Sequence, residues 1–236
     1  CTIVGAIHKG QMIHTEIKKH TLLEKNLVIN NALIDMYAKC GLLNIARHVF
    51  DELPIQDGVS WASLILGYAE HGHEEEALKC YEMMQIDGVL PDAVIFMSIL
   101  KACSMTGDIK TGCEIHAETK RRGLFKEDMM IGNSLIDIYA RNGWVIRAQE
   151  IFFELPVPDI VSWTTLIYGY AEDGQGEESL KCFQQMQQEG ICPDVITFVC
   201  ILKGCGSISV VLEIRKIHAS LAGQDLINSD ILVGTT

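Results

Sequence analysis

Three His-x-Glu triplets are the residues of this sequence with the clearest potential for metal chemistry. They are His14-Thr-Glu16, His73-Glu-Glu75 and His116-Ala-Glu118. In zinc deaminases such a triplet provides one zinc ligand and the general acid/base, while a Pro-Cys-x-x-Cys segment provides the other ligands. The sequence has nine cysteines but no Cys-x-x-Cys pair, and it contains no phosphate-binding Gly-rich loop or nucleophile elbow. We therefore predict no metal site, no cofactor and no enzymatic activity.

A second set of polar residues is suited to hydrogen bonding rather than to catalysis. Asn31 and Asn133 lie inside predicted helices, where asparagine is disfavoured. Their amides both donate and accept, the hydroxyl of Thr164 does so in a smaller space, and an aspartate offers up to four acceptor sites. Aspartates end six successive segments, at Asp57, Asp92, Asp128, Asp159, Asp194 and Asp230. Because an aspartate also caps a following helix well, capping and ligand binding both remain open for these six residues.

The spacing of these residues follows an internal repeat of 102 residues. Val59-Ser-Trp-Ala-Ser-Leu-Ile-Leu-Gly-Tyr-Ala-Glu matches Val161-Ser-Trp-Thr-Thr-Leu-Ile-Tyr-Gly-Tyr-Ala-Glu, and Asn31-Ala-Leu-Ile-Asp matches Asn133-Ser-Leu-Ile-Asp. Repeats of 31, 35 and 36 residues fill each period. We predict repeat boundaries at 27–57, 58–92, 93–128, 129–159, 160–194 and 195–230. Residues 1–26 match the end of an earlier long repeat, and 231–236 begin a further short one.

Each repeat has the pattern of two amphipathic helices joined by a tight turn. Apolar residues recur at three- and four-residue spacing on either side of position 15, which is glycine in five repeats and Ser209 in the sixth. Position 24 is aromatic or histidine, at Phe50, Tyr81, His116, Phe152, Phe183 and His218. This pattern predicts that His14, His116 and His218 are packing residues. Because neither helix can bury its apolar stripe alone, we predict an all-α solenoid of stacked helix-turn-helix repeats.

Composition excludes several other classes of protein. Apolar residues make up 48% of the 236 residues and charged residues 21%, which argues against a disordered chain or a coiled coil. The longest apolar runs have about eight residues, too few to span a bilayer. The net charge of −12 argues against attachment to nucleic acid or membrane mainly through a basic surface. The odd cysteine count indicates a reducing environment, and the start at Cys1 without a methionine indicates a fragment or a processed chain.

Several segments resemble pentatricopeptide repeats, among them Leu33-Ile-Asp-Met-Tyr-Ala-Lys-Cys-Gly and Gly190-Ile-Cys-Pro-Asp. The cycle of 31-, 35- and 36-residue repeats is similar to that of the plant PLS subclass. The resemblance implies a right-handed α-solenoid that binds single-stranded RNA in mitochondria or chloroplasts, one base per repeat. It further implies a role in selecting sites for C-to-U RNA editing, with a deaminase domain supplied from outside this chain. The resemblance also implies that small organellar editing cofactors bind the long repeats, where Met97 and Val199 are the apolar fifth residues.

The resemblance also assigns roles to individual positions. In the family the fifth residue of the first helix and the last residue of the repeat face the base edge, and the second residue packs against the base planes. The base-reading pairs would be Asn31/Asp57, Ala62/Asp92, Met97/Asp128, Asn133/Asp159, Thr164/Asp194 and Val199/Asp230. The packing residues would be Val28, Val59, Val94, Met130, Val161 and Ile196. Asn with Asp resembles a uridine reader and Thr with Asp a guanosine reader, which predicts the sequence U-?-?-U-G-? along the RNA.

A protein-binding scaffold of the tetratricopeptide kind, without any role in RNA binding, is the alternative. The acidic net charge favours this alternative, whereas the three polar pairs favour RNA. If RNA is the ligand, the acidity predicts modest affinity that depends on base contacts and stacking, with a shallow dependence on salt.

Overall fold

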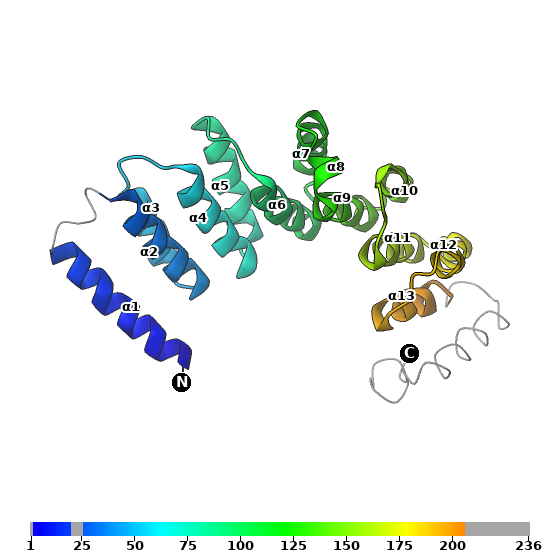
Figure 1. The fold of residues 1–236 in the computed structure, drawn as a ribbon, viewed down its shortest axis with the longest axis horizontal. Coiled ribbons are helices and arrows are strands. Elements are labelled where there is room, and N and C mark those ends of the chain that lie inside the picture. The colour runs from blue at the N-terminus through cyan, green and yellow to red at the C-terminus, as the bar shows by residue number, and fades with distance from the viewer. Residues whose placement is uncertain (1, 20–25, 206–236) are drawn as a thin grey trace. The chain divides into compact units, whose positions relative to one another are not determined.

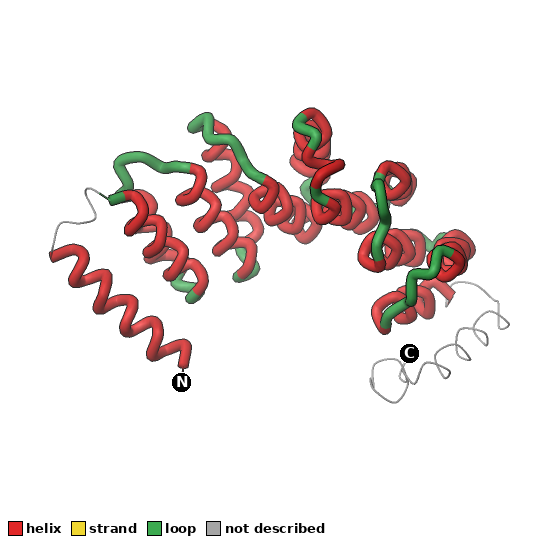
Figure 2. Tube along the Cα trace, viewed as in Figure 1, coloured by secondary structure: helices red, strands yellow, loops and turns green. Residues whose placement is uncertain are grey.

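The structure, a computed structural model, describes residues 2–19 and 26–205 of the chain. Every regular element within these residues is a helix (Figure 2). The chain divides into two compact units, Cys1–Thr106 and Gly107–Thr236, and each is described by itself below. No helix among the described residues is long and apolar enough to cross a membrane.

The described helices of the first unit follow one another with short connections (Figure 1). They are α1 (Thr2–Lys19), α2 (Leu27–Lys39), α3 (Leu43–Asp51), α4 (Gly58–Glu70), α5 (Glu74–Ile86) and α6 (Ala93–Thr106). Helix α2 packs against α3, its partner in the same repeat, and against α4, the first helix of the next repeat. Helix α4 in turn packs against α5 and α6. The first helices therefore form one layer, and the second helices cover it.

The second unit repeats this arrangement. Its described helices are α7 (Ile109–Arg121), α8 (Leu124–Glu127), α9 (Met129–Arg141), α10 (Val145–Glu154), α11 (Ile160–Glu172), α12 (Gly176–Gln188) and α13 (Val195–Cys205). Helix α9 packs against α10 and α11, and α11 packs against α12 and α13. Each helix thus buries its apolar face against both its partner and the next repeat, as expected of a solenoid.

Left-handed glycines end the first helix of each described pair. The backbone angle φ lies between 73° and 78° at Gly41, Gly72, Gly107, Gly143 and Gly174, a conformation that other residues adopt only at a cost. At the first of these turns, the amide of Leu42 donates to the carbonyl of Tyr37 over 2.9 Å, which closes the helix end. The predicted glycine turns are confirmed at all five positions, while Ser209 lies outside the described residues.

Two further glycines allow neighbouring first helices to approach closely. A Cβ atom added at Gly67 would lie 2.6 Å from the Cβ of Ala38, and one added at Gly169 would lie 2.7 Å from the Cβ of Ala140. Both distances are far below van der Waals contact, so a larger side chain at either glycine would force the helices apart. The same contact therefore sets the spacing of α2 and α4 in the first unit and of α9 and α11 in the second.

The two histidines that the repeat pattern assigns to packing are buried. His14 and His116 are 9% and 5% exposed, and their Nδ1 atoms lie 2.9 and 3.1 Å from the hydroxyl oxygens of Tyr37 and Tyr139. The prediction of a packing role is thus confirmed for both residues. His218 lies outside the described residues.

The long repeat 93–128 departs from the predicted two helices. After α7, Gly123 adopts a left-handed conformation with φ of 75°, and the four-residue helix α8 follows. Phe125 of this short helix is 3% exposed, so its ring fixes α8 against the core. The expectation of two helices was wrong here because the periodicity of so short a segment is not visible in the sequence.

Candidate nucleic-acid interface

The aspartates at the repeat ends cap the helices that follow them. A side-chain oxygen accepts a hydrogen bond from the backbone amide two or three residues later, at distances of 2.8–2.9 Å, in Asp57, Asp92, Asp128, Asp159 and Asp194. Each bond satisfies one of the amide groups that a helix start leaves without an internal partner. The capping role is therefore confirmed for all five, and Asp230 lies outside the described residues.

Capping places each carboxylate beside the first helix of its own repeat, where the fifth residue can reach it. The Nδ2 atom of Asn31 donates to both carboxylate oxygens of Asp57, over 3.1 and 3.3 Å. The Nδ2 atom of Asn133 donates to Oδ1 of Asp159 over 3.3 Å. Because a carboxylate only accepts, the NH₂ side of each amide must face it. The opposite side, the Oδ1 atom, is the part of each amide left for another donor.

The two asparagines differ in what meets this oxygen. The hydroxyl of Ser162 shares its one proton between Oδ1 of Asn133, over 2.6 Å, and Oδ1 of Asp159, over 2.9 Å. The matching serine of the first unit, Ser60, instead donates to the backbone carbonyl of Asp57 over 2.8 Å. Oδ1 of Asn31 is consequently buried without a hydrogen-bond partner among the described residues. Such an acceptor costs free energy until a donor reaches it.

Hydrogen bonds around Asp159 keep this carboxylate ionised. Burial acts to raise the pKa of Asp159, but bonds from the amide and hydroxyl of Ser162 and from the amide of Asn133 outweigh it. The net effect is a pKa below the usual value. At neutral pH the pair therefore presents one negative charge that is already hydrogen-bonded within the protein.

The Thr164–Asp194 pair is joined through a third residue. The hydroxyl of Thr197 donates to Oδ1 of Asp194 over 2.7 Å, and the Thr164 and Thr197 oxygens lie 2.7 Å apart. Since Thr197 has used its only proton, Thr164 donates to Thr197 and keeps its own lone pairs free. Thr197 thus belongs to the site, although its sequence position gave no sign of it.

The remaining fifth residues cannot form hydrogen bonds through their side chains. Ala62, Met97 and Val199 are each partly buried. Ala62 and Asp92 both lie in the first unit. Met97 and Asp128 belong to different units. The expected partner of Val199 lies outside the described residues. The pairing of these three residues therefore stays a prediction.

The residues expected to pack against bases are apolar and exposed. They are Val28, Val59, Val94, Met130, Val161 and Ile196, with exposed fractions between 44% and 76%. Each is the second residue of a first helix, so every unit presents three of them at matching positions. Their repetition at one position of each first helix gives every unit a row of apolar side chains that a planar ligand could contact.

The His-x-Glu triplets form no metal site in the part of the chain that the structure describes. No group of three or more His, Cys, Asp or Glu side chains there could hold a metal ion. Glu118 instead accepts from Arg121 and Arg122 on its own helix, and these bonds lower its pKa to about 2.

Family models of the pentatricopeptide repeat match most of the repeats described above. The PPR repeat model matches residues 31–54, 59–89 and 133–157, and the PPR repeat family model matches residues 158–207, together more than half of the chain. The chain belongs to the pentatricopeptide repeat family. Three Arabidopsis thaliana proteins named as containing pentatricopeptide repeats are similar to it. One is 33% identical over 98% of this chain, one named mitochondrial is 34% identical over 93%, and one named chloroplastic is 37% identical over 89%.

This pentatricopeptide repeat chain covers only part of those relatives, namely 23%, 21% and 34% of their lengths. Among solved structures, it is similar to the pentatricopeptide repeat protein PPR10 in complex with an 18-nucleotide psaJ RNA element. The TM-score is 0.76 at 24% identity, over 93% of this chain and 33% of that one. A crystal structure of PPR10 from maize gives a TM-score of 0.63 at 20% identity, over 83% of this chain and 29% of that one. The fold is therefore that of an α-solenoid of stacked helix pairs.

Proposed function

We propose that this chain binds single-stranded RNA and that each repeat contacts one base. The hydrogen-bonded Asn31–Asp57 and Asn133–Asp159 pairs carry the proposal, because they combine a donor, an acceptor and a fixed carboxylate at matching positions of two repeats. The RNA bound by PPR10, to which the chain is similar in fold, supports the same ligand class.

An unpaired uracil fits the Asn31 site. Its N3–H group is a donor for the unpartnered Oδ1 of Asn31, and burying the pair would satisfy both groups at once. The exposed Val28 and Val59 at the starts of successive first helices offer apolar surfaces for the two faces of the base. At Thr164 the smaller hydroxyl leaves more room, which suits guanine. The proposed RNA sequence for residues 27–230 is U-?-?-U-G-?.

Base contacts and stacking, rather than phosphate contacts, provide most of the proposed affinity. The chain carries a net charge of −12, and several of its cations already pair with acids on the same helix, such as Lys39 with Asp35 and Arg141 with Asp137. Few phosphate contacts mean few released counterions, so we expect the affinity to fall only slightly as salt is raised.

The relatives extend the proposal to the biological setting. Two of them are named mitochondrial and chloroplastic, and we place this chain in an organellar RNA-processing factor. Site recognition for C-to-U editing is the proposed task, with a deaminase domain supplied outside the described residues or by a partner. Met97 and Val199, the apolar fifth residues of the long repeats, are the proposed contacts for small editing cofactors.

A gel shift with two RNAs tests the proposal. One RNA embeds U-A-A-U-G-A in a longer strand, and the other carries A at both U positions. With this chain at one stated salt concentration, the first RNA should bind at least about tenfold more tightly, since two base-specific contacts are lost in the second. Equal affinities would contradict base reading by the asparagine pairs. No binding to either RNA would favour a protein-binding scaffold instead.

The Gln184→Ala variant is the matched control for all RNA-binding variants. Gln184 is exposed on α12, outside the base-reading and packing positions. Its removal should leave both affinities unchanged.

A further inference from the structure

A cavity of about 500 Å³ lies in the second unit, away from the base-reading positions. Its lining includes His116 and Lys120 of α7, Tyr139 of α9, and Trp144 and Arg147 at the start of α10. Tyr139 follows Asn133 by six residues, which places them about 9 Å apart along the helix. The volume lies within the range of sites that hold small ligands.

Polar contacts hold the Tyr139 ring in the wall of this cavity. The Tyr139 hydroxyl donates to the sulfur of Cys113 over 3.4 Å, lies 3.1 Å from Nδ1 of His116, and accepts from the guanidinium of Arg147. The Nε2 atom of His116 has no hydrogen-bond partner among the described residues, but it is closed to solvent. The histidine therefore positions the tyrosine rather than meeting a ligand.

Trp144 provides an aromatic surface in the lining of the cavity. The indole of Trp144 is 50% exposed and lies nearly parallel to the ring of Tyr139, at 26° and with a centroid distance of 6.1 Å. Trp61 and Trp163, the other two tryptophans of the chain, are each only 1% exposed. A half-exposed indole held by a second ring provides a rigid surface on which a planar group can stack.

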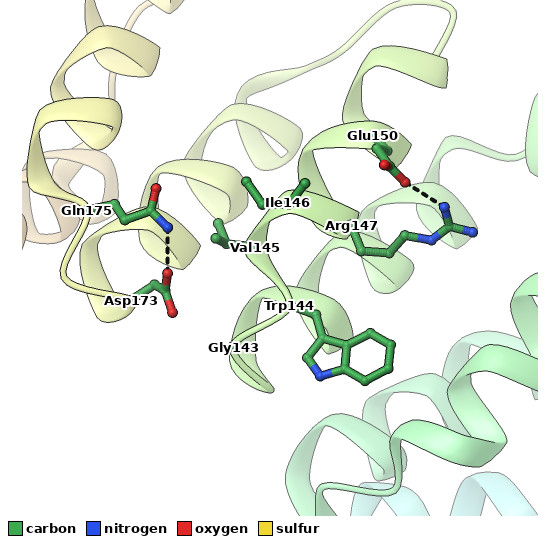
Figure 3. Close-up of a pocket in the computed structure, with 8 residues that line it drawn as sticks. All are labelled: Gly143, Trp144, Val145, Ile146, Arg147, Glu150, Asp173 and Gln175. Atoms are coloured by element: carbon green, nitrogen blue, oxygen red, sulfur yellow. Dashed lines mark hydrogen bonds and ion pairs between the residues drawn. The ribbon is translucent and has the colours of Figure 1, made fainter.

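The charged side chains that line the cavity are both cations. Lys120 bonds to Glu154 over 2.7 Å and Arg147 to Glu150 over 2.5 Å, but neither carboxylate belongs to the lining. A lysine has three donors and an arginine five, so both keep donors for another anion. Figure 3 shows a cavity of about 400 Å³ that shares Trp144 and Arg147, with both side chains projecting from the start of α10.

The first unit provides an internal comparison, 102 residues earlier in the sequence. There His14 and Tyr37 form the same contact, His14 Nε2 also lacks a partner, and Lys18 lies 3.9 Å from Glu52. Leu42 and Ile45, however, stand where the second unit has Trp144 and Arg147. The histidine–tyrosine pair is therefore common packing, and the indole and guanidinium are what distinguish the second unit.

We propose that the cavity binds a nucleotide, with the base stacked on Trp144 and the phosphate held by Lys120 and Arg147. A planar ring joined to an anion matches both features of the lining. The nucleotide is either free in solution or part of an RNA strand. The proposal does not depend on base reading by the asparagine pairs, because it uses none of the same residues.

Tryptophan fluorescence during titration with AMP tests the proposal, because Trp144 is the tryptophan that a ligand can reach. We expect saturable quenching with half-saturation below about 1 mM, a strength that one stack and two charge-assisted contacts can provide. Inorganic phosphate alone should not quench. In parallel, a 20-nucleotide poly(A) strand tests the RNA source. Saturable quenching by either probe supports the proposal, and its absence with both, up to about 10 mM nucleotide, would overturn it.

Variants taken from the chain's own repeats then locate the site. Arg147→Ile should weaken AMP binding by about tenfold, and Lys120→Ala, which introduces the residue found at Ala222, should weaken it by about fivefold. Trp144→Leu, measured by equilibrium dialysis with labelled AMP, should weaken it by about tenfold or more. Lys18→Ala, the equivalent change 102 residues earlier, is the matched control and should leave binding unchanged. If all three variants keep their melting temperature and bind AMP as the unaltered chain does, the proposal is wrong.

Discussion

The Asn31–Asp57 pair of the first unit and the Asn133–Asp159 pair of the second have the same residue types and spacing, but they differ in one hydrogen bond. Ser162 donates to the carbonyl oxygen of Asn133, whereas Ser60 turns to the backbone of Asp57 and leaves Asn31 without a donor. The second pair is thus satisfied within the protein. The first keeps a buried acceptor without a partner among the described residues. We therefore expect the Asn31 site to cost more stability and the Asn133 site to contribute less to binding.

The largest expected effect is on stability, and it comes from the two glycines between neighbouring first helices. Here we expect the same result in both units. Gly67→Ala and Gly169→Ala each place a Cβ atom within 2.7 Å of an alanine on the neighbouring first helix. Each should lower the free energy of unfolding by about 2–3 kcal/mol, measured by urea denaturation, because the helices must move apart. Gly72→Ala is a poor control, since its φ of 74° is itself strained for alanine. Gln184→Ala should cost nothing. A change below 0.5 kcal/mol in either glycine variant would show that the helices are not held by these contacts.

Replacing each asparagine with alanine should weaken RNA binding by different amounts at the two sites. Asn31→Ala should weaken binding of the U-A-A-U-G-A RNA by about tenfold, because its free oxygen has no partner to give up before it meets the base. Asn133→Ala should weaken binding by only about threefold, because its oxygen must first leave Ser162. Fluorescence anisotropy with labelled RNA measures both. Losses of equal size, or a larger loss at Asn133, would contradict the difference between the sites.

The carboxylate of the second pair should also stabilise the fold in a pH-dependent manner. The folded-state pKa of Asp159 lies below its usual value, so its contribution is present above the unfolded-state pKa and is lost as pH falls through the folded-state value. At pH 7, Asp159→Ala should cost about 1 kcal/mol of unfolding free energy, the typical value of an N-cap. Denaturation curves of both proteins should converge as pH falls below about 4. A gap that stays constant down to pH 2.5 would show that the charge has no part in capping.

Removing the serine hydroxyls should change RNA affinity least of all, and it should do so at only one of the two sites. Ser162→Ala frees the oxygen of Asn133 and should raise RNA affinity by about twofold to threefold, although it removes part of the capping box. Ser60→Ala should leave affinity unchanged, since the Ser60 hydroxyl does not touch Asn31. The same anisotropy measurement applies. A gain of equal size in both variants would mean that the two serines occupy the same position in solution.

Much of this architecture is predictable from the sequence because its physical causes are local. Glycine at position 15 is required by a left-handed turn, as at Gly41 and Gly143, and the apolar periodicity on each side predicts two helices. The 102-residue repeat also indicated that Asn31 and Asn133 occupy equivalent positions, and the structure brings each close to the aspartate expected from the family resemblance.

The features that the sequence could not predict depend on side-chain direction and on contacts between helices. Ser60 and Ser162 are the same residue at the same repeat position, so their different hydrogen bonds are visible only in three dimensions. Thr197 joins Thr164 to Asp194 across two successive first helices. The cavity beside Trp144 arises where three helices meet, and no motif in the sequence marks it.

Exchange of a single base-reading residue tests the central claim most directly. The Asn133→Thr variant gives the second short repeat the Thr–Asp combination found at Thr164 and Asp194. Selection from a randomised RNA pool, with this variant and the unaltered chain at one stated salt concentration, reports the preferred base at each position. The account predicts that the fourth position of U-?-?-U-G-? changes from U to G and that the others stay the same. An unchanged preference at that position, in a variant that still binds RNA, would contradict it.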